Sequence, residues 1–324
     1  MSSNAVDLFV VRAAAERLAG HAHRTPVLMC ATLDRLAGRS LFFKCEQLQK
    51  VGAFKFRGAC NAVMRLPDDE AARGVVTHSS GNHAQALALA ARLRGVAAHI
   101  VMPHNAAAVK RRAVEGYGGR VIVCEPTLAA RETAAAAVQA QTGATFIHPY
   151  DHPDIIAGQG TVALELIEQV PGLDAIIAPV GGGGLVSGIC IAAHGIAPAL
   201  RVIAAEPAGA DDAARSKAAG TLIPQTAPDT IADGLLTSLG ALTWPIIREH
   251  VERVITVSEA EIVAAMRLAW ERAKLLIEPS AAVAVAAALS AECRAIRGIE
   301  RLGIVLSGGN VDLDGLPWTS GASA

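Results

Sequence analysis

Short, uninterrupted apolar segments alternate with longer segments of helical character along most of the chain. The apolar segments lack the apolar–polar alternation of half-exposed strands, and such runs are typical of parallel strands buried on both faces. The predicted strands are Leu41–Cys45, Ala98–Met102, Val121–Cys124, Ala175–Pro179, Val202–Ala205 and Leu302–Leu306. The predicted helices are Phe54–Met64, Asn82–Arg94, Ala106–Gly116, Thr127–Gln141, Thr161–Gln169, Leu185–His194 and Glu259–Lys274. This alternation predicts an α/β fold with parallel sheets covered by helices.

The composition agrees with a large core. Of the 324 residues, 52% are hydrophobic but only 3% are aromatic, so alanine and aliphatic side chains must fill that core. The length is sufficient for two lobes. The six cysteines form no CxxC pair and lie mostly in apolar segments, which indicates buried free thiols in a reducing compartment. They are Cys30, Cys45, Cys60, Cys124, Cys190 and Cys293.

The charge pattern argues against two classes of partner. The formal net charge is −1, and no cluster of basic residues marks a nucleic-acid-binding face. No stretch of about 18 uncharged apolar residues is present, so we expect no membrane span. Residues 1–18 read as an amphipathic helix without the features of a signal peptide. We therefore expect a cytoplasmic protein that acts on a small molecule.

Glycine-rich or polar turns follow several of the predicted strands. These turns are Ser79–Gly81, Gly181–Gly184 and Ser307–Gly309. In open α/β sheets, ligands bind outside the carboxyl ends of the strands. We therefore expect the three turns to line one crevice.

The four consecutive glycines Gly181–Gly184 stand between a predicted strand and a predicted helix. Glycines let backbone N–H groups approach an anion, and a helix N-terminus adds positive potential, so this loop predicts a phosphate site. It is not a P-loop, because no Gly-Lys-Ser/Thr follows, and it lacks the third glycine of a dinucleotide fingerprint. Glu206 at the end of the next strand keeps a dinucleotide loop open as one alternative, and a plain tight turn is another.

Lys55 lies between Phe54 and Phe56 near the start of a predicted helix. An apolar setting and a helix N-terminus both disfavour the ammonium form, so they lower the pKa of the lysine. A neutral lysine can form a Schiff base with a carbonyl compound. On its own the pattern is weak, since a lysine beside phenylalanine is usually a surface residue.

Four segments, in this order, resemble the serine/threonine dehydratase and serine racemase family, including its 3-hydroxyaspartate dehydratase branch. The segments are Gly52-Ala53-Phe54-Lys55-Phe56-Arg57-Gly58-Ala59, Ser79-Ser80-Gly81-Asn82-His83-Ala84-Gln85, Gly181–Gly184 and Ser307-Gly308-Gly309-Asn310. The resemblance extends from about Arg24 to Leu313. It implies a two-lobed, fold-type II pyridoxal 5'-phosphate enzyme similar to the tryptophan synthase β subunit. Residues 1–73 and 152–324 would form the large cofactor-binding domain, residues 74–151 the small domain, and two copies a homodimer.

The resemblance also assigns the cofactor contacts. Lys55 would hold pyridoxal phosphate through a Schiff base and then act as a base on one face of the substrate Cα. Phe54 would flank the cofactor ring, Asn82 would hydrogen-bond its 3-hydroxyl, and Ser307 would face the pyridine nitrogen. A hydroxyl there makes the ring a weaker electron sink than a carboxylate would, which favours β-elimination over transamination. The remaining cofactor-binding residues would be Gly181, Gly182, Gly183, Gly184, Leu185 and Glu278.

The same resemblance places the substrate carboxylate on the turn before the helix that starts at Asn82. Its residues would be Ser79, Ser80, Gly81, Asn82 and His83. Ser80 matches the base that serine racemases use on the face opposite Lys55, whereas capping of the helix is its structural alternative. Thr237 matches a substrate-contacting hydroxyl.

A divalent cation is implied beside the active site. Glu206 and Asp212 would supply carboxylates and Ala210 a backbone carbonyl. Oxygen ligands suit Mg²⁺ or Ca²⁺, with Mn²⁺ as a further possibility. Spacing alone is a weak signal, because acidic loops are usually only solvated.

The identity of the substrate depends on a possible second carboxylate. Arg131, His148 and Tyr150 lie in segments that flank the active site in this family, and a cationic group there would suit 3-hydroxyaspartate. We therefore expect an ammonia-lyase that converts 3-hydroxyaspartate to iminosuccinate, and then to oxaloacetate and ammonia. Alternatives are a serine or threonine dehydratase, a serine racemase, a catalytically idle amino-acid-binding regulator and a nicotinamide oxidoreductase.

Overall fold

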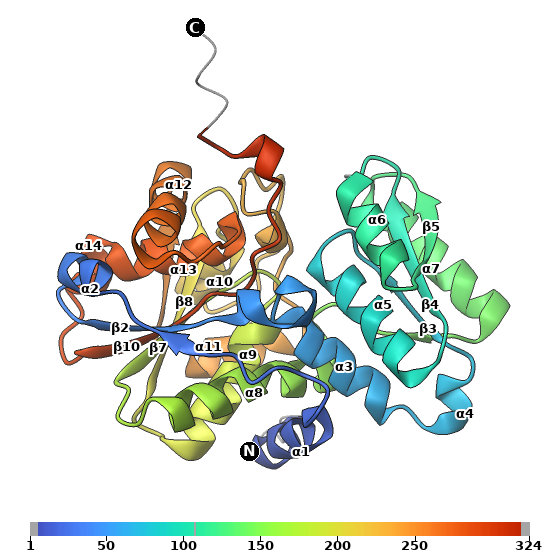
Figure 1. The fold of residues 1–324 in the computed structure, drawn as a ribbon, viewed down its shortest axis with the longest axis horizontal. Coiled ribbons are helices and arrows are strands. Elements are labelled where there is room, and N and C mark those ends of the chain that lie inside the picture. The colour runs from blue at the N-terminus through green and yellow to red at the C-terminus, as the bar shows by residue number, and fades with distance from the viewer. Residues whose placement is uncertain (1–5, 107, 319–324) are drawn as a thin grey trace, which may run out of the picture.

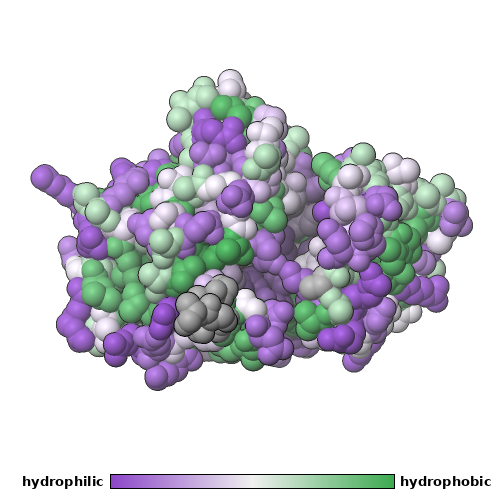
Figure 2. All heavy atoms as spheres, turned by 90° about the horizontal axis from the view of Figure 1, so that it is seen from above, coloured by the Kyte–Doolittle hydropathy of each residue, from purple (hydrophilic) through white to green (hydrophobic). Residues whose placement is uncertain are grey.

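The computed structural model describes residues 6–106 and 108–318, which form two α/β parts side by side (Figure 1). The larger part contains a six-stranded sheet in the order β1-β2-β10-β7-β8-β9, and the smaller contains a four-stranded sheet in the order β5-β4-β3-β6. All strand pairs are parallel except β1–β2. The predicted fold class is confirmed. Seen from above, the surface is hollowed between the two parts (Figure 2).

All six predicted strands are present, and the structure adds four. The large sheet contains β1 (Val27–Leu28), β2 (Ser40–Lys44), β7 (Ala175–Pro179), β8 (Arg201–Pro207), β9 (Arg253–Val257) and β10 (Arg301–Val305). The small sheet contains β3 (Val75–His78), β4 (Ala98–Pro103), β5 (Arg120–Cys124) and β6 (Thr145–Phe146). The sequence analysis missed β1, β3, β6 and β9, which are short or mix polar with apolar residues.

The helices follow the prediction where amphipathic segments are long. The first seven are α1 (Leu8–Leu18), α2 (Ala31–Ala37), α3 (Lys55–Arg65), α4 (Asp68–Ala71), α5 (Asn82–Arg94), α6 (Ala108–Gly116) and α7 (Leu128–Thr142). The others are α8 (Pro153–Gln169), α9 (Gly184–Ile196), α10 (Asp212–Ala219), α11 (Thr243–His250), α12 (Glu259–Leu268), α13 (Pro279–Leu289) and α14 (Ala291–Arg294). Residues 1–5 of the predicted N-terminal helix, and Ala107 of the helix predicted over Ala106–Gly116, lie outside the described residues.

Two predicted helices need correction. The helix predicted from Thr161 begins at Pro153, because His152 caps its N-terminus by accepting the N–H of Asp154 and proline suits the first helical turn. The helix predicted over Glu259–Lys274 is α-helical only to Leu268. A π-helical turn, Ala269–Ala273, follows, and Lys274 ends it with φ +60°.

The strands β2, β7, β8 and β10 of the large sheet and β3 and β4 of the small sheet are mostly buried, as continuous apolar strands require, whereas the edge strand β5 is partly exposed. In β7, Ala175 and Ile177 pack in a core with α2, α12 and α13, whereas Ile176 and Ala178 pack in a core with α8, α9 and α11. In the small sheet, Val75 faces the side of α5 and Val76 faces α7. The small sheet falls within residues 74–151, but the proposed domain boundaries stay predictions. Within the described residues, no helix is both long and apolar enough to span a bilayer.

Candidate active site

Lys55 lies at the first position of α3, against a loop from the end of β10. Ala53 pairs with Gly308 in an isolated antiparallel bridge, and the N–H of Phe54 donates to the carbonyl of Ser307 at 3.0 Å. Because β2 and β10 are neighbours in the sheet, the segments that follow them leave the same edge. Two motifs some 250 positions apart in the sequence are therefore joined by backbone hydrogen bonds.

Gly52 and Asn310 make this junction close. Gly52 has φ +69°, and a Cβ on it would stand 2.7 Å from Oδ1 of Asn310, so glycine is required here. Nδ2 of Asn310 donates to the carbonyl of Val51 at 2.7 Å and to Oδ1 of Asn82 at 2.8 Å. Asn310 therefore connects the Lys55 segment with the start of α5 in the small part. The sequence analysis quoted Asn310 in a motif but gave it no role.

Glu278 completes this polar junction. Its Oε1 accepts from Nδ2 of Asn82 at 2.9 Å, and its Oε2 accepts from the N–H of Asn310 at 3.1 Å. Burial raises the pKa of Glu278 to about 7, a rise that Asp233 reinforces and the bond from Asn82 opposes. The structure thus brings together four predicted cofactor residues, Lys55, Asn82, Glu278 and Ser307, although their individual roles stay predictions.

The side chain of Lys55 is partly buried. Its Nζ donates to the carbonyl of Pro149 at 2.9 Å and lies 5.2 Å from the centre of the Phe54 ring. Burial lowers the pKa of Lys55 to about 8. A large part of this amine is therefore neutral near pH 8, which is the form that attacks a carbonyl.

This pKa predicts how the reactivity of Lys55 varies with pH. Because only the neutral amine reacts, labelling of Lys55 by a small amine-reactive reagent in the cofactor-free chain is expected to rise with pH and reach half its maximum near pH 8. For exposed lysines, labelling is expected to reach half its maximum near pH 10.4. Labelling followed by mass spectrometry measures both midpoints in one sample, and a Lys55 midpoint equal to that of exposed lysines would contradict the burial argument.

The glycine turn lies between β7 and α9, as predicted. The first N–H groups of an α-helix lack intrahelical acceptors, and here they belong to Gly184 and Leu185, so they can bind a phosphate. A Cβ on Gly182 would stand 2.3 Å from the ring of Tyr150, so only glycine fits against that ring. Thr243 donates from Oγ1 to the carbonyl of Gly182 at 2.8 Å, which fixes the turn. The turn therefore fits the phosphate group of pyridoxal phosphate.

The segment from His148 to Asp151 connects Lys55 with the glycine turn. Nδ1 of His148 accepts from the N–H groups of Tyr150 at 3.3 Å and Asp151 at 2.8 Å. Asp151 in turn accepts three N–H groups at the start of α11, from Ala241, Leu242 and Thr243. Burial lowers the pKa of His148 to about 4, so His148 is neutral at pH 7. The sequence analysis missed Asp151, whose position one residue before the α8 cap, His152, gave no sign of a contact with α11.

Four rings gather where the small sheet meets this segment. His148 and Tyr150 pack edge to face with centroids 4.5 Å apart, and the rings of His78, Phe146 and His148 all contact one another. Burial raises the pKa of Tyr150 to about 12, and a hydrogen bond with Thr237 opposes that rise. The structure therefore places predicted substrate residues His148, Tyr150 and Thr237 in one contiguous group.

The turn before α5 joins β3 to the helix that carries Asn82. The hydroxyl of Ser79 accepts the N–H of Gly81 at 3.3 Å, whereas no described residue hydrogen-bonds to the hydroxyl of Ser80. His83 is buried, and its Nε2 donates to the carbonyl of Ile147 while Nδ1 has no partner among the described residues. Burial, followed by the charge of Lys55, lowers the pKa of His83 well below its usual range. Hydrogen-bonding groups on this turn therefore remain available to a ligand.

Arg131 lies early in α7, on the small part. Its Nε is buried and has no hydrogen-bond partner among the described residues. Burial lowers the pKa of His78, and the nearby charge of Arg131 contributes to this. Arg131 is therefore close enough to influence His78, which directly precedes the predicted carboxylate-binding turn.

The proposed cation site contains two buried carboxylates. Glu206 accepts the N–H groups of Ala213 at 3.0 Å and Ala214 at 2.9 Å, so it also caps α10. Burial raises the pKa of Glu206 to about 8 and that of Asp212 to about 6. Oδ1 of Asp212 is buried without a partner among the described residues, and Ala210 is fully buried nearby. In the described part of the chain, no three His, Cys, Asp or Glu side chains form a metal cluster, so a cation here would also need carbonyl or water ligands.

Comparison with known proteins agrees with this geometry. A family model described as "Pyridoxal-phosphate dependent enzyme" matches residues 18–308. The chain is 53% identical to a serine racemase of Arabidopsis thaliana, covering 98% of this chain and 96% of the relative. It is also 53% identical to a beta-hydroxyaspartate dehydratase of Paracoccus denitrificans, covering 94% and 96%. The structure of maize serine racemase superposes with a TM-score of 0.95 at 51% identity, covering 98% and 97% of the two chains.

Proposed function

Because the chain belongs to the pyridoxal-phosphate-dependent enzyme family, we propose that it is an ammonia-lyase that converts 3-hydroxyaspartate to oxaloacetate and ammonia. The observation that carries this proposal is Arg131, whose Nε is buried without a partner among the described residues and whose charge acts on His78, directly before the turn Ser79–Gly81. A buried N–H without a partner is costly, and the second carboxylate of a dicarboxylic substrate would satisfy it. The relative named beta-hydroxyaspartate dehydratase supports the same substrate.

The residues of this chain suit such an elimination. Bound pyridoxal phosphate supplies an electron sink that makes the Cα proton acidic. Lys55, neutral near pH 8, can take that proton from one face, and Ser80 can take it from the other. The removed proton and the departing β-hydroxide leave as water, and hydrolysis of the released imine then yields the 2-oxo acid and ammonia. His148, whose pKa is lowered to about 4, is neutral at pH 7 and packs against the ring of Tyr150, so this pair adds no charge beside Lys55.

A serine racemase is the second candidate, because relatives of that name are equally similar to the chain. Measuring products separates the two reactions. The proposal predicts one ammonia and one 2-oxo acid for each substrate consumed, with inverted amino acid as a minor product. If purified enzyme mainly inverts the Cα of serine and releases little 2-oxo acid, the lyase proposal is wrong.

We also propose that Mg²⁺ binds between Glu206 and Asp212. Cation binding needs both carboxylates ionised, and their pKa values near 8 and 6 are raised by burial, so Mg²⁺ should stabilise the fold more at pH 8 than at pH 6. At about 100 times its Kd, the gain is about 2.7 kcal/mol. Thermal unfolding with and without Mg²⁺ measures it.

A neighbouring carboxylate provides the control for this prediction. Asp212→Asn is expected to remove the Mg²⁺-dependent rise in Tm. Asp211→Asn is expected to keep it, because Asp211 pairs with Arg215 at 2.7 Å and is no proposed ligand. Equal responses from both variants and the parent would show that no cation binds here.

A further inference from the structure

Arg57 lies on the side of α3 opposite Lys55. The two residues are two positions apart, which corresponds to about 200° around an α-helix, so their side chains leave in opposite directions. Lys55 reaches Pro149, whereas Arg57 points into the large part, where its side chain is 1% exposed. A charged residue so deeply buried needs paired partners.

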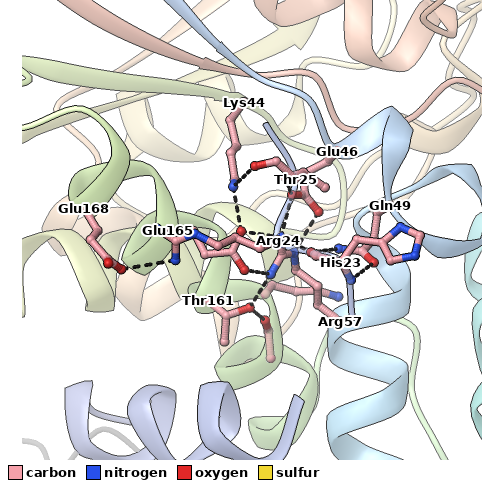
Figure 3. Close-up of polar contacts among 12 residues, drawn as sticks. His23, Arg24, Thr25, Lys44, Glu46, Gln49, Arg57, Thr161, Glu165 and Glu168 are labelled. Carbon is pink, nitrogen blue, oxygen red and sulfur yellow. Dashed lines mark hydrogen bonds and ion pairs between the residues drawn. The ribbon is translucent and has the colours of Figure 1, made fainter. Parts of the chain in front are cut away.

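The guanidinium of Arg57 forms hydrogen-bonded ion pairs with two carboxylates (Figure 3). Its Nε and Nη2 donate to the two oxygens of Glu46, both at 2.8 Å. Nη1 and Nη2 donate to the two oxygens of Glu165, at 2.7 and 2.9 Å. Nη1 also reaches the hydroxyl of Thr161 at 3.2 Å, and Nη2 the carbonyl of His23 at 3.3 Å. The guanidinium therefore engages both carboxylates in two-point contacts.

Lys44 forms a second ion pair with the carboxylate of Glu165. Its Nζ donates to Glu165 at 2.6 Å, to Gln169 at 2.9 Å and to the carbonyl of Thr25 at 2.8 Å. The two cations and two anions sum to zero. Burial alone would lower the pKa of Arg57, but Glu46 and Glu165 outweigh it and raise the pKa, so the guanidinium stays ionised.

The partners of Arg57 come from separate segments that surround the start of α3. Glu46 belongs to a 3-10 helix after β2, Glu165 and Thr161 belong to α8, and His23 lies in the segment after α1. A second contact acts at the next residue, where Oε1 of Gln159 in α8 accepts the N–H of Gly58 at 3.2 Å. The first turn of α3 is therefore fixed against both rotation and translation.

From this geometry we propose that Arg57, held between Glu46 and Glu165, is a positioning residue that aims the amine of Lys55. The proposal rests on Lys55 being the cofactor lysine but not on which amino acid is the substrate. Two-point guanidinium–carboxylate contacts fix direction as well as distance, which apolar packing does not. Lysine at position 57 keeps the charge but loses this planar fork.

The first test is Arg57→Lys, with Arg201→Lys as the matched control. Arg201 is the first residue of β8 and contacts both oxygens of Glu252. The N-terminal end of β8 is opposite the strand ends that carry the site. In Arg57→Lys, the midpoint for Lys55 labelling in the cofactor-free chain is expected to rise from near 8 by about one unit, because water reaches the displaced amine. In the holoenzyme, kcat is expected to fall about 100-fold, with KM within about threefold. Arg201→Lys is expected to match the parent in both.

Glu46→Gln gives a second, milder test. It keeps Arg57 and its contacts with Glu165. If Arg57→Lys does not fold, this variant still tests whether Arg57 positions Lys55. We expect a shift of the Lys55 midpoint and a loss of kcat in the same direction but smaller. A variant with a lower Tm but an unchanged Lys55 midpoint and unchanged kcat per bound cofactor would overturn the proposal, since the cluster would then be only structural. If neither the parent nor any variant acts on hydroxyaspartate, the proposed substrate is wrong, but the proposed role of Arg57 is still tested by the Lys55 midpoint.

Discussion

Lys55→Ala is expected to lower kcat by at least about 10⁴-fold, the upper range for loss of a single proton-transfer group. The variant loses the proposed base for Cα and the amine that we propose holds the cofactor. The absorbance band of the lysine-bound cofactor is expected to disappear as well. Absorbance spectra and the rate of 2-oxo acid release check the two effects independently.

Lys50→Ala is the control for this prediction. Lys50 lies five positions earlier and its amine stands over the ring of Phe56 at 5.5 Å, so it shares the apolar surroundings but not the contact with Pro149. It is expected to keep the band and most of the activity. A Lys55→Ala protein with full turnover would refute the assignment of the cofactor lysine, and with it the proposed mechanism.

Arg131→Met is expected to lower kcat/KM for 3-hydroxyaspartate roughly 30- to 150-fold, which corresponds to about 2–3 kcal/mol, the cost of removing one partner of a hydrogen-bonded charge pair. Serine lacks the second carboxylate, so its kcat/KM is expected to change little. Methionine keeps much of the arginine stem and removes the buried donor that has no partner among the described residues. The ratio of the two kcat/KM values is therefore the decisive quantity.

Arg120→Met controls for the loss of a positive charge on the small part. Arg120 is exposed at the start of β5, so the substitution alters the net charge equally without touching the site. It is expected to leave the ratio unchanged. If Arg131→Met lowers kcat/KM equally for both substrates, Arg131 stabilises the small part and does not bind the second carboxylate of the substrate.

The parts of the site that follow strands were predictable because they are local. The residues on either side of Gly181–Gly184 are enough to predict the strand, the turn and the helix. The residues next to Lys55 are enough to predict the helix start and the flanking rings. By contrast, β3 is too short to stand out, yet it places Ser79 and Ser80. Alanine-rich α13 has no clear periodicity because almost all of it is buried, although it begins directly after Glu278.

The contacts that fix the site were not predictable, because they join distant segments. Arg57 and Glu165 are 108 positions apart, and Asn82 and Asn310 are 228 apart. Nothing in the residues around Arg57 distinguishes a buried guanidinium from a solvated one. Only the folded chain shows which carboxylates it meets.

The central claim, a lyase specific for a β-hydroxy dicarboxylate, is tested most directly by kcat/KM for 2-oxo acid release. L-serine, D-serine, L-threonine and the four stereoisomers of 3-hydroxyaspartate are compared with pyridoxal phosphate and Mg²⁺ present. The account predicts that one 3-hydroxyaspartate isomer exceeds serine and threonine by at least about 100-fold, as expected where a buried donor is satisfied by only one substrate class. Equal or higher values for serine or threonine would contradict it and make Arg131 a structural residue.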